Sequence, residues 1–106
     1  MKILAIIPAR MASSRFPGKP LKKINGKEMI KIIYQNVDKN KKLKDTIIAT
    51  CDNEIKLFCI KNNMKYIMTS KKHVRASDRT AEAVIKYEKF NKTKIDLVVM
   101  IQGDEP

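Results

Sequence analysis

The chain has 106 residues, of which 43% are hydrophobic and 32% charged, and its formal net charge is +12. That length accommodates one domain with a sizeable core, and the composition is that of a soluble globular protein. The apolar run at residues 3–7 is too short for a signal sequence or a membrane span, so we expect a cytoplasmic protein with no membrane partner.

The first half of the chain predicts two main strands separated by a helix. Residues 2–7 form an apolar strand, and residues 21–24 predict a short strand that ends in a turn at Asn25-Gly26. A strand follows at residues 46–50. The intervening helix is predicted from apolar residues at helical spacing, namely Met29, Ile32, Ile33 and Val37.

The second half alternates in the same way. Asp52 or Asn53 is expected to cap a helix, a strand follows at residues 66–69, and the last and most apolar strand covers residues 96–101. The apolar face of the first of these helices is predicted to comprise Ile55, Phe58 and Cys59. A further helix, capped by Ser77 or Asp78, is predicted from Ala81, Val84, Ile85 and Tyr87.

This alternation predicts an α/β fold with βαβ units, a parallel sheet and right-handed crossovers. The loops at residues 10–19, 73–79 and 102–105 would then share the carboxyl edge of the sheet, where open α/β sheets bind ligands. The chain stops within the last of these loops, directly after its most apolar strand. We therefore expect residues 1–106 to be the amino-terminal part of a larger single domain.

The loop after the first strand, residues 8–20, reads PARMASSRFPGKP and contains many hydrogen-bond donors and no acidic residue. Arginine and lysine neutralise phosphate charge, hydroxyl groups donate hydrogen bonds, and glycine permits a close approach of the backbone to a ligand. The loop therefore predicts an anion site, most simply for a nucleoside triphosphate, although a basic surface loop without function is the alternative. The candidate contacts are Arg10, Ser13, Ser14, Arg15, Gly18 and Lys19.

Arginine is confined to two segments of the chain. Of the 23 basic residues only four are arginines, and these are Arg10, Arg15, Arg75 and Arg79. A guanidinium group can bind phosphate or carboxylate with two parallel hydrogen bonds, which lysine cannot do. The distribution favours a ligand-binding role for both segments.

The last residues, Gln102-Gly103-Asp104-Glu105-Pro106, place a carboxylate at the end of the fourth main strand. Mg²⁺ prefers hard oxygen ligands and takes much of its shell from water and substrate phosphates, so one aspartate suits it. We therefore expect Asp104 to bind Mg²⁺, with a turn-capping role as the alternative. Glu105 is expected to be solvated.

The segment from His73 to Arg79 precedes a predicted helix, whose amino terminus favours anions. His73 is the only histidine, and a local hydrogen-bonding role is expected rather than catalysis. Ser77 is expected to cap the helix, to contact a ligand, or to do both.

The two cysteines, Cys51 and Cys59, have neither CxxC spacing nor a second histidine with which to complete a metal site, so we expect free thiols. The excess of lysine leaves one further alternative, a basic nucleic-acid-binding domain. That alternative is disfavoured, because the few aromatic residues are not interleaved with the lysines as in a stacking platform.

The motifs, in this order, resemble those of the CMP-Kdo synthetases (3-deoxy-manno-octulosonate cytidylyltransferases). Residues 8–21 are similar to the family signature PAR-x-x-S-[ST]-R-x-P-G-K-P-L, and residues 102–106 match its Q-G-D-E-P in full. Residues 25–30 are similar to N-G-x-P-M-I, and Thr50-Cys51-Asp52 stands where A-T-D-D is usual. The resemblance spans the whole chain.

The resemblance implies a nucleotidyltransferase with a Rossmann-like α/β fold that couples CTP to an acidic keto-sugar in lipopolysaccharide synthesis, and a homodimer in the full-length form. It implies that Arg10 and Lys19 contact the triphosphate and act in catalysis together with the Mg²⁺ ligand Asp104. The expected nucleotide contacts in the matching motifs are Pro8, Ala9, Arg10, Ser13, Ser14, Arg15, Gly18, Lys19, Ser77, Arg79 and Gln102.

The chain departs from the family in two respects. Where H-x-S-G-T-[DE]-R is usual, Arg75 and Ala76 replace a small hydroxyl residue and glycine. The chain is also less than half the usual family length. Two alternatives therefore stay open besides the nucleic-acid one: activation of another acidic sugar, such as a nonulosonate, and a nucleotide-binding fragment without activity.

Overall fold

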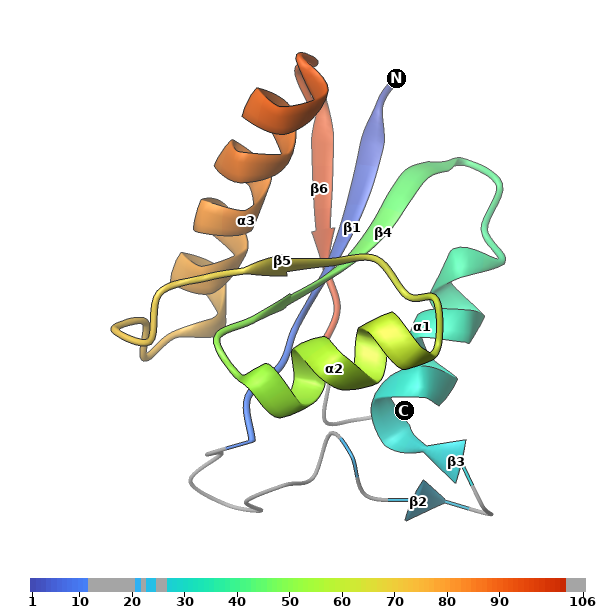
Figure 1. Cartoon of the computed structure of the whole chain (residues 1–106). Coiled ribbons are helices and arrows are strands. Elements are labelled where there is room, and N and C mark those ends of the chain that lie inside the picture. The colour runs from blue at the N-terminus through green and yellow to red at the C-terminus, as the bar shows by residue number, and fades with distance from the viewer. Residues whose placement is uncertain (12–20, 22, 25–26, 103–106) are drawn as a thin grey trace.

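The computed structural model describes residues 1–11, 21, 23–24 and 27–102, and Figure 1 shows the arrangement of their elements. Strands and helices alternate after a short hairpin, which confirms the α/β prediction. The elements are β1 (Ile3–Pro8), β2 (Lys23–Ile24), β3 (Lys27–Glu28), α1 (Met29–Asp38), β4 (Leu43–Thr50), α2 (Asn53–Lys61), β5 (Tyr66–Met68), α3 (Ala76–Asn91) and β6 (Leu97–Met100).

The main sheet has four parallel strands in the order β5-β4-β1-β6. Strand β1 lies in the interior of the sheet, where Ile6 is opposite Ile47 on one side and Met100 on the other. Because helices cover both faces of a parallel sheet, its central strands are apolar throughout. The sequence of β1 follows this rule, and the strand is buried from its second residue onward.

Helices α1 and α2 lie on one face of the sheet and α3 lies on the other (Figure 1). Ile7 and Ile48 point toward α1 and α2, whereas Leu4 and Ile6 point toward α3, because successive side chains of a strand alternate between its faces. The result is a three-layer arrangement with one apolar cluster on each side of the sheet. The predicted helix with Met29 and Ile33 on its buried face is confirmed as α1.

The predicted buried face of α3 needs correction. Ala81 and Ile85 are exposed, and the buried residues of this helix are Arg79, Thr80, Ala83 and Tyr87. The predicted cap also differs, because α3 begins at Ala76, with Arg75 in the capping position and no side-chain capping bond. The prediction was wrong because it counted only apolar residues as buried. Arg79 is polar, yet it is buried because it makes polar contacts.

Strand β6 is apolar but incompletely covered. Its four residues expose between 37% and 47% of their surface. Val98 and Met100 are paired with Leu4 and Ile6 and so share the α3 face of the sheet. The outer edge of β6 pairs with no other strand in the described part of the chain.

Two smaller findings complete the fold. The hairpin β2–β3 confirms the short strand predicted before residue 25, while the turn at residues 25–26 lies outside the described residues. None of the described helices combines the length and the apolar character needed to cross a bilayer.

Candidate functional site

The order of the strands reverses at β1. From β1 the chain continues through α1 to β4 on one side, and it returns from β5 through α3 to β6 on the other side. The amide of Ile101 donates to the carbonyl oxygen of Ile6 at 2.9 Å, so the segment that follows β6 leaves the sheet beside the end of β1. A parallel sheet binds ligands in the crevice beyond the carboxyl ends of its strands at such a reversal.

The first residues of the predicted anion loop lie at this edge. Pro8 is the last residue of β1, and Ala9 is held to β4 by a 2.9 Å hydrogen bond from its amide to the Ala49 carbonyl oxygen. Arg10 follows and is half-buried. The other predicted contacts of this loop lie outside the described residues, namely Ser13, Ser14, Arg15, Gly18 and Lys19.

The end of β6 places Gln102 at the same edge, where it is exposed. Asp104, the predicted Mg²⁺ ligand, lies outside the described residues. Among the residues that the structure does describe, no three histidine, cysteine or acidic side chains lie close enough together to hold a metal ion. The prediction of a magnesium site therefore still depends on Asp104.

Asp52 connects the loop after β1 to the loop after β4. Its carboxylate accepts a 2.9 Å hydrogen bond from the Met11 amide, and its own amide donates to Thr50 Oγ1 at 3.1 Å. Asp52 occupies the capping position of α2, as one of the two predicted choices, but its side chain makes no capping bond. The carboxylate instead anchors the beginning of the donor-rich loop.

Arg79 is 1% exposed, although the sequence analysis selects it as a nucleotide contact. Its Nε donates to Thr69 Oγ1 at 3.0 Å, and its Nη2 lies within hydrogen-bonding distance of the carbonyl oxygens of Ser70 and His73 (3.3 Å each) and of Cys51 Sγ (3.6 Å). The contacts found for this guanidinium are thus with the chain itself. That Arg79 also contacts a nucleotide stays a prediction.

Glu82 is a residue that the sequence analysis misses. Its Oε1 accepts a 3.0 Å hydrogen bond from the Ser70 amide and lies 2.6 Å from His73 Nε2, while Oε2 lies 2.7 Å from Lys86 Nζ. The hydrogen bond from Lys86, followed by that from the Ser70 amide, lowers the pKa of Glu82 to about 2. The local hydrogen-bonding role expected for His73 is confirmed.

The spacing of charged residues in the sequence places Glu82 on the same helix face as Arg79. Arg79, Glu82 and Lys86 follow one another at intervals of three and four residues, which places them on one face of α3. That face points toward the segment between β5 and α3, residues 69–75, because Arg79 and Glu82 both bond to it. Ser77 lies in the first turn of α3 and is exposed.

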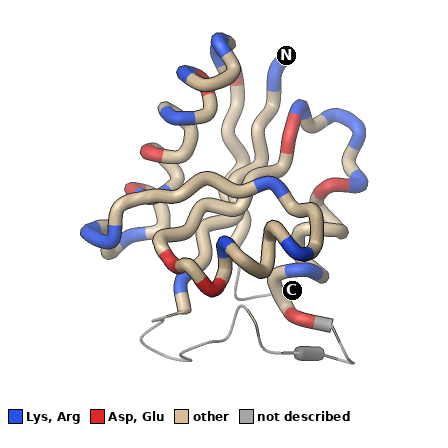
Figure 2. The backbone as a smooth tube through the Cα atoms, in the orientation of Figure 1, with Lys and Arg blue, Asp and Glu red and all other residues tan. Residues whose placement is uncertain are grey.

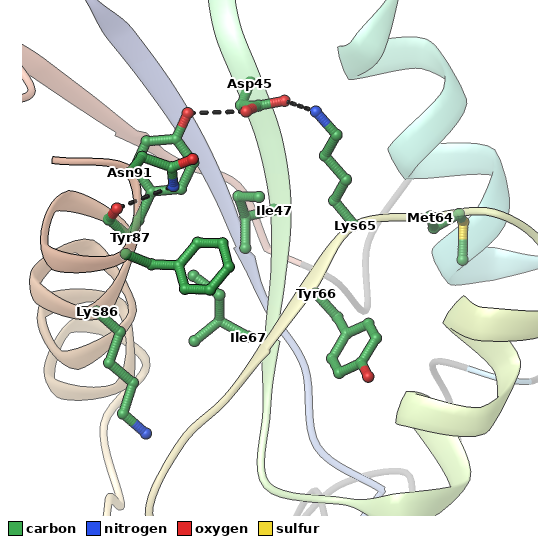
Figure 3. Close-up of a pocket in the computed structure, with 10 residues that line it drawn as sticks. Asp45, Ile47, Met64, Lys65, Tyr66, Ile67, Lys86, Tyr87 and Asn91 are labelled. Carbon is green, nitrogen blue, oxygen red and sulfur yellow. Dashed lines mark hydrogen bonds and ion pairs between the residues drawn. The ribbon is translucent and has the colours of Figure 1, made fainter. Parts of the chain in front are cut away.

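A cavity of about 540 Å³ lies elsewhere, between the carboxyl-terminal half of α3 and strands β4 and β5 (Figure 3). Asp45 lies at its margin, where it accepts a 2.7 Å hydrogen bond from the Tyr87 hydroxyl and pairs with Lys65. Burial and this hydrogen bond raise the pKa of Tyr87 to about 12. The cavity contains none of the predicted site residues, and it lies toward the amino end of β4.

The positive charge of the described residues is dispersed. Figure 2 shows lysine and arginine distributed over several helices, strands and loops of the described chain rather than gathered on one element. A nucleic-acid-binding domain gathers its basic residues into a patch or stripe. The dispersed pattern disfavours that alternative.

Comparisons with known proteins agree with the geometry. A family model described as "Cytidylyltransferase" matches residues 4–106. The 3-deoxy-manno-octulosonate cytidylyltransferase of Cytophaga hutchinsonii is 42% identical over the whole chain, which covers 41% of that relative. The corresponding protein of Leptospira interrogans is 42% identical over 99% of the chain, which covers 40% of it.

Two further similarities extend this result. The 8-amino-3,8-dideoxy-manno-octulosonate cytidylyltransferase of Shewanella piezotolerans is also 42% identical, over 100% of the chain and 42% of that relative. The solved structure of CMP:2-keto-3-deoxy-manno-octonic acid synthetase complexed with CTP superposes with a TM-score of 0.84 at 35% identity, covering 100% of this chain and 42% of that one. The chain therefore spans about two fifths of the length of the curated relatives it matches, and it belongs to the cytidylyltransferase family.

Proposed function

We propose that this chain forms the nucleotide-binding part of a cytidylyltransferase that joins CTP to 3-deoxy-manno-octulosonate, giving the CMP-sugar and diphosphate. One observation carries the proposal: the loops that follow β1 and β6 leave the sheet side by side at the reversal of strand order. These are the two loops whose sequences contain the candidate phosphate and metal contacts. Membership of the family and the CTP-bound structural neighbour support the choice of nucleotide.

The proposed reaction is an in-line displacement at the α-phosphorus of CTP. The anomeric hydroxyl oxygen of the sugar forms the new P–O bond, the bond from the α-phosphorus to the bridging oxygen breaks, and diphosphate leaves with that electron pair. The hydroxyl proton is lost to solvent. In such a transfer the protein acts mainly by positioning the reactants and neutralising charge.

The proposed role of Arg10 and Lys19 is to neutralise the departing diphosphate, and that of Gln102 is to contact the nucleotide. Asp104 would hold Mg²⁺. A single carboxylate fits this ion, which takes the rest of its shell from water and phosphate oxygens. When bound, Mg²⁺ would polarise phosphate oxygens and compensate their charge.

The similarities determine the sugar substrate less closely than they determine the nucleotide. Relatives named for 3-deoxy-manno-octulosonate and for its 8-amino-3,8-dideoxy analogue are equally similar to this chain, at 42% identity. Arg75 adds a positive charge beside the first turn of α3, so a further acidic sugar such as a nonulosonate belongs in the same comparison. Diphosphate release with CTP and each sugar in turn distinguishes these substrates.

We place the reaction in the cytoplasm, which the free thiols of Cys51 and Cys59 support. The proposed assembly of the full-length form is a homodimer. A fragment that binds nucleotide without turnover is the alternative for this chain by itself.

Calorimetric titration with CTP in the presence of Mg²⁺, followed by a diphosphate-release assay, tests the proposal. Where turnover is measured, Lys19→Ala and Asp104→Ala should each slow it by about a hundredfold, equivalent to about 3 kcal/mol in the barrier. Lys42→Ala, at an exposed position before β4 and away from every segment assigned to the site, is the matched control and should behave as the unaltered chain. CTP binding without turnover supports the fragment alternative, and no CTP binding contradicts the proposal.

A further inference from the structure

The segment between β5 and α3, residues 69–75, has little apolar packing to fix its conformation. Lys71, Lys72, Val74 and Arg75 are all exposed. Its beginning is held at the carboxyl edge of the sheet, where the Thr69 amide donates to the Thr50 carbonyl oxygen at 2.9 Å. Beyond Thr69, the conformation of the segment depends on polar contacts with α3.

Two side chains of α3 hold this segment from complementary sides. Arg79 donates to the carbonyl oxygens of Ser70 and His73, both at 3.3 Å. Glu82 accepts from the amide of Ser70 at 3.0 Å and contacts the ring of His73 at 2.6 Å. Both polar groups of the Ser70 backbone are therefore engaged by one helix, as the backbone of a loop requires if it is to stay ordered.

Glu82 is itself held in place. Lys86, one turn further along α3, contacts Glu82 Oε2 at 2.7 Å and donates to the Met68 carbonyl oxygen at 2.7 Å. The carboxylate thus lies between a lysine on one side and the Ser70 amide with His73 on the other. Lys86 compensates the negative charge of Glu82, and the contacts on both sides of the carboxylate fix its orientation toward residues 69–75.

The same contacts extend to the proposed nucleotide site. Arg79 Nη2 lies 3.6 Å from Cys51 Sγ, and the next residue, Asp52, accepts the hydrogen bond from Met11. The segment is thereby joined through the end of β4 to the loop after β1. A displacement of residues 69–75 would move groups along the whole edge.

We propose that Glu82 is a positioning residue, which holds residues 69–75 in the conformation that completes the nucleotide site. The inference rests on the proposed function, since it assigns this segment to the CTP site. The residue acts through Ser70 and His73. Preorganised groups bind more tightly because no ordering cost remains to be met on binding.

The test uses two substitutions at Glu82. Glu82→Ala removes the acceptor altogether. Glu82→Gln removes the charge but retains an oxygen that can accept from the Ser70 amide. We expect Glu82→Ala to raise the Kd for Mg²⁺–CTP about tenfold, and Glu82→Gln to stay within about threefold of the unaltered chain.

Glu88→Ala is the matched control, because Glu88 makes the same kind of contact at the other end of the helix. Its Oε2 accepts from the Ile95 amide at 2.8 Å. Glu88→Ala should lower the thermal unfolding temperature, because the Ile95 amide loses its acceptor, while leaving the Kd for CTP unchanged. If a loss of stability alone weakened CTP binding, both Glu82→Ala and Glu88→Ala would bind CTP more weakly.

Hydrogen exchange without nucleotide provides an independent readout. The Ser70 amide should be protected in the unaltered chain and exchange faster in Glu82→Ala, but not in Glu88→Ala. Equal exchange of this amide in the unaltered chain and in Glu82→Ala, or equal CTP affinity, overturns the positioning role while leaving the proposed function intact. No CTP binding by the unaltered chain contradicts the proposed function, and with it the role of Glu82.

Discussion

The amide of Met11 donates to the carboxylate of Asp52 at 2.9 Å, across 41 residues of sequence. Met11 belongs to the first part of the predicted anion loop and is the last residue described before residues 12–20, and Asp52 stands at the beginning of α2. The bond therefore fixes the start of the predicted anion loop to the amino-terminal end of α2. Similar contacts through Arg79 and Glu82 continue along the carboxyl edge of the sheet.

Asp52→Ala should weaken Mg²⁺–CTP binding and lower the free energy of unfolding by about 1–2 kcal/mol, because the Met11 amide loses its acceptor. Calorimetric titration and urea unfolding measure the two effects. Asp52→Asn retains an acceptor oxygen and should recover most of both. Glu54→Ala, at an exposed acidic residue of the same helix, should change neither, and native affinity in Asp52→Ala would show that this anchor is unimportant for binding.

Cys51→Asp should stabilise the fold by about 1–2 kcal/mol, since a charge-assisted hydrogen bond would replace the weak thiol contact. Arg79 is buried, and among the described residues it makes no salt bridge. The thiol of Cys51 lies 3.6 Å from its Nη2, within reach of a carboxylate at the same position. Urea unfolding should rank Cys51→Asp above the unaltered chain and above the control Cys51→Ser. A Cys51→Asp variant less stable than Cys51→Ser would indicate that desolvation of the new carboxylate outweighs the pair.

The stability of the chain should decline in acid partly through Glu82. Folding lowers the pKa of this carboxyl from 4.5 to about 2, mainly through the hydrogen bond from Lys86. A carboxyl with a lowered pKa stabilises the fold above its unfolded-state pKa and loses that contribution as the pH falls toward its folded-state pKa. The unfolding free energy of the unaltered chain should therefore fall more steeply below pH 4.5 than that of Glu82→Gln. Parallel curves from urea unfolding at a series of pH values would contradict this assignment.

The two thiols should differ in reactivity. Burial raises the pKa of Cys59 to about 12, and its side chain is fully buried on the inner face of α2, whereas Cys51 is only half-buried. Because the thiolate is the reacting species, iodoacetamide should alkylate Cys51 at least about tenfold faster than Cys59 in the native chain. Peptide mass spectrometry gives the two rates, with the urea-unfolded chain as the control in which they converge. Equal rates in the native chain would mean that Cys59 is accessible.

The elements that bury apolar residues were predictable from the sequence. The pattern of apolar residues identified β1, α1, β4 and α2, which bury apolar side chains. It also identified β5 and β6, although the residues of β6 stay partly exposed in the structure. The parallel arrangement of the main strands followed from their alternation with helices, whereas their order in the sheet was not predicted.

Polar burial was not predictable in this way. Arg79 is buried because four groups, which belong to Thr69, Ser70, His73 and Cys51, contact its guanidinium. Those groups come together only in three dimensions. The buried face of α3 was misassigned for the same reason. The contacts of Asp52 with Met11 and of Glu82 with Ser70 likewise join a side chain to a backbone amide elsewhere in the chain, so the sequence does not show the partner of either side chain.

The central claim is that the carboxyl edge of the sheet, at the reversal of strand order, binds CTP. Titration of the isotope-labelled chain with Mg²⁺–CTP, followed by the NMR shifts of its backbone amides, tests this most directly. The account predicts that the largest shifts occur at Arg10, Met11, Cys51 and Gln102, while Lys65 and Phe90, which line the cavity beside α3, stay unchanged. Shifts confined to that cavity, or no shifts at saturating nucleotide, would contradict it.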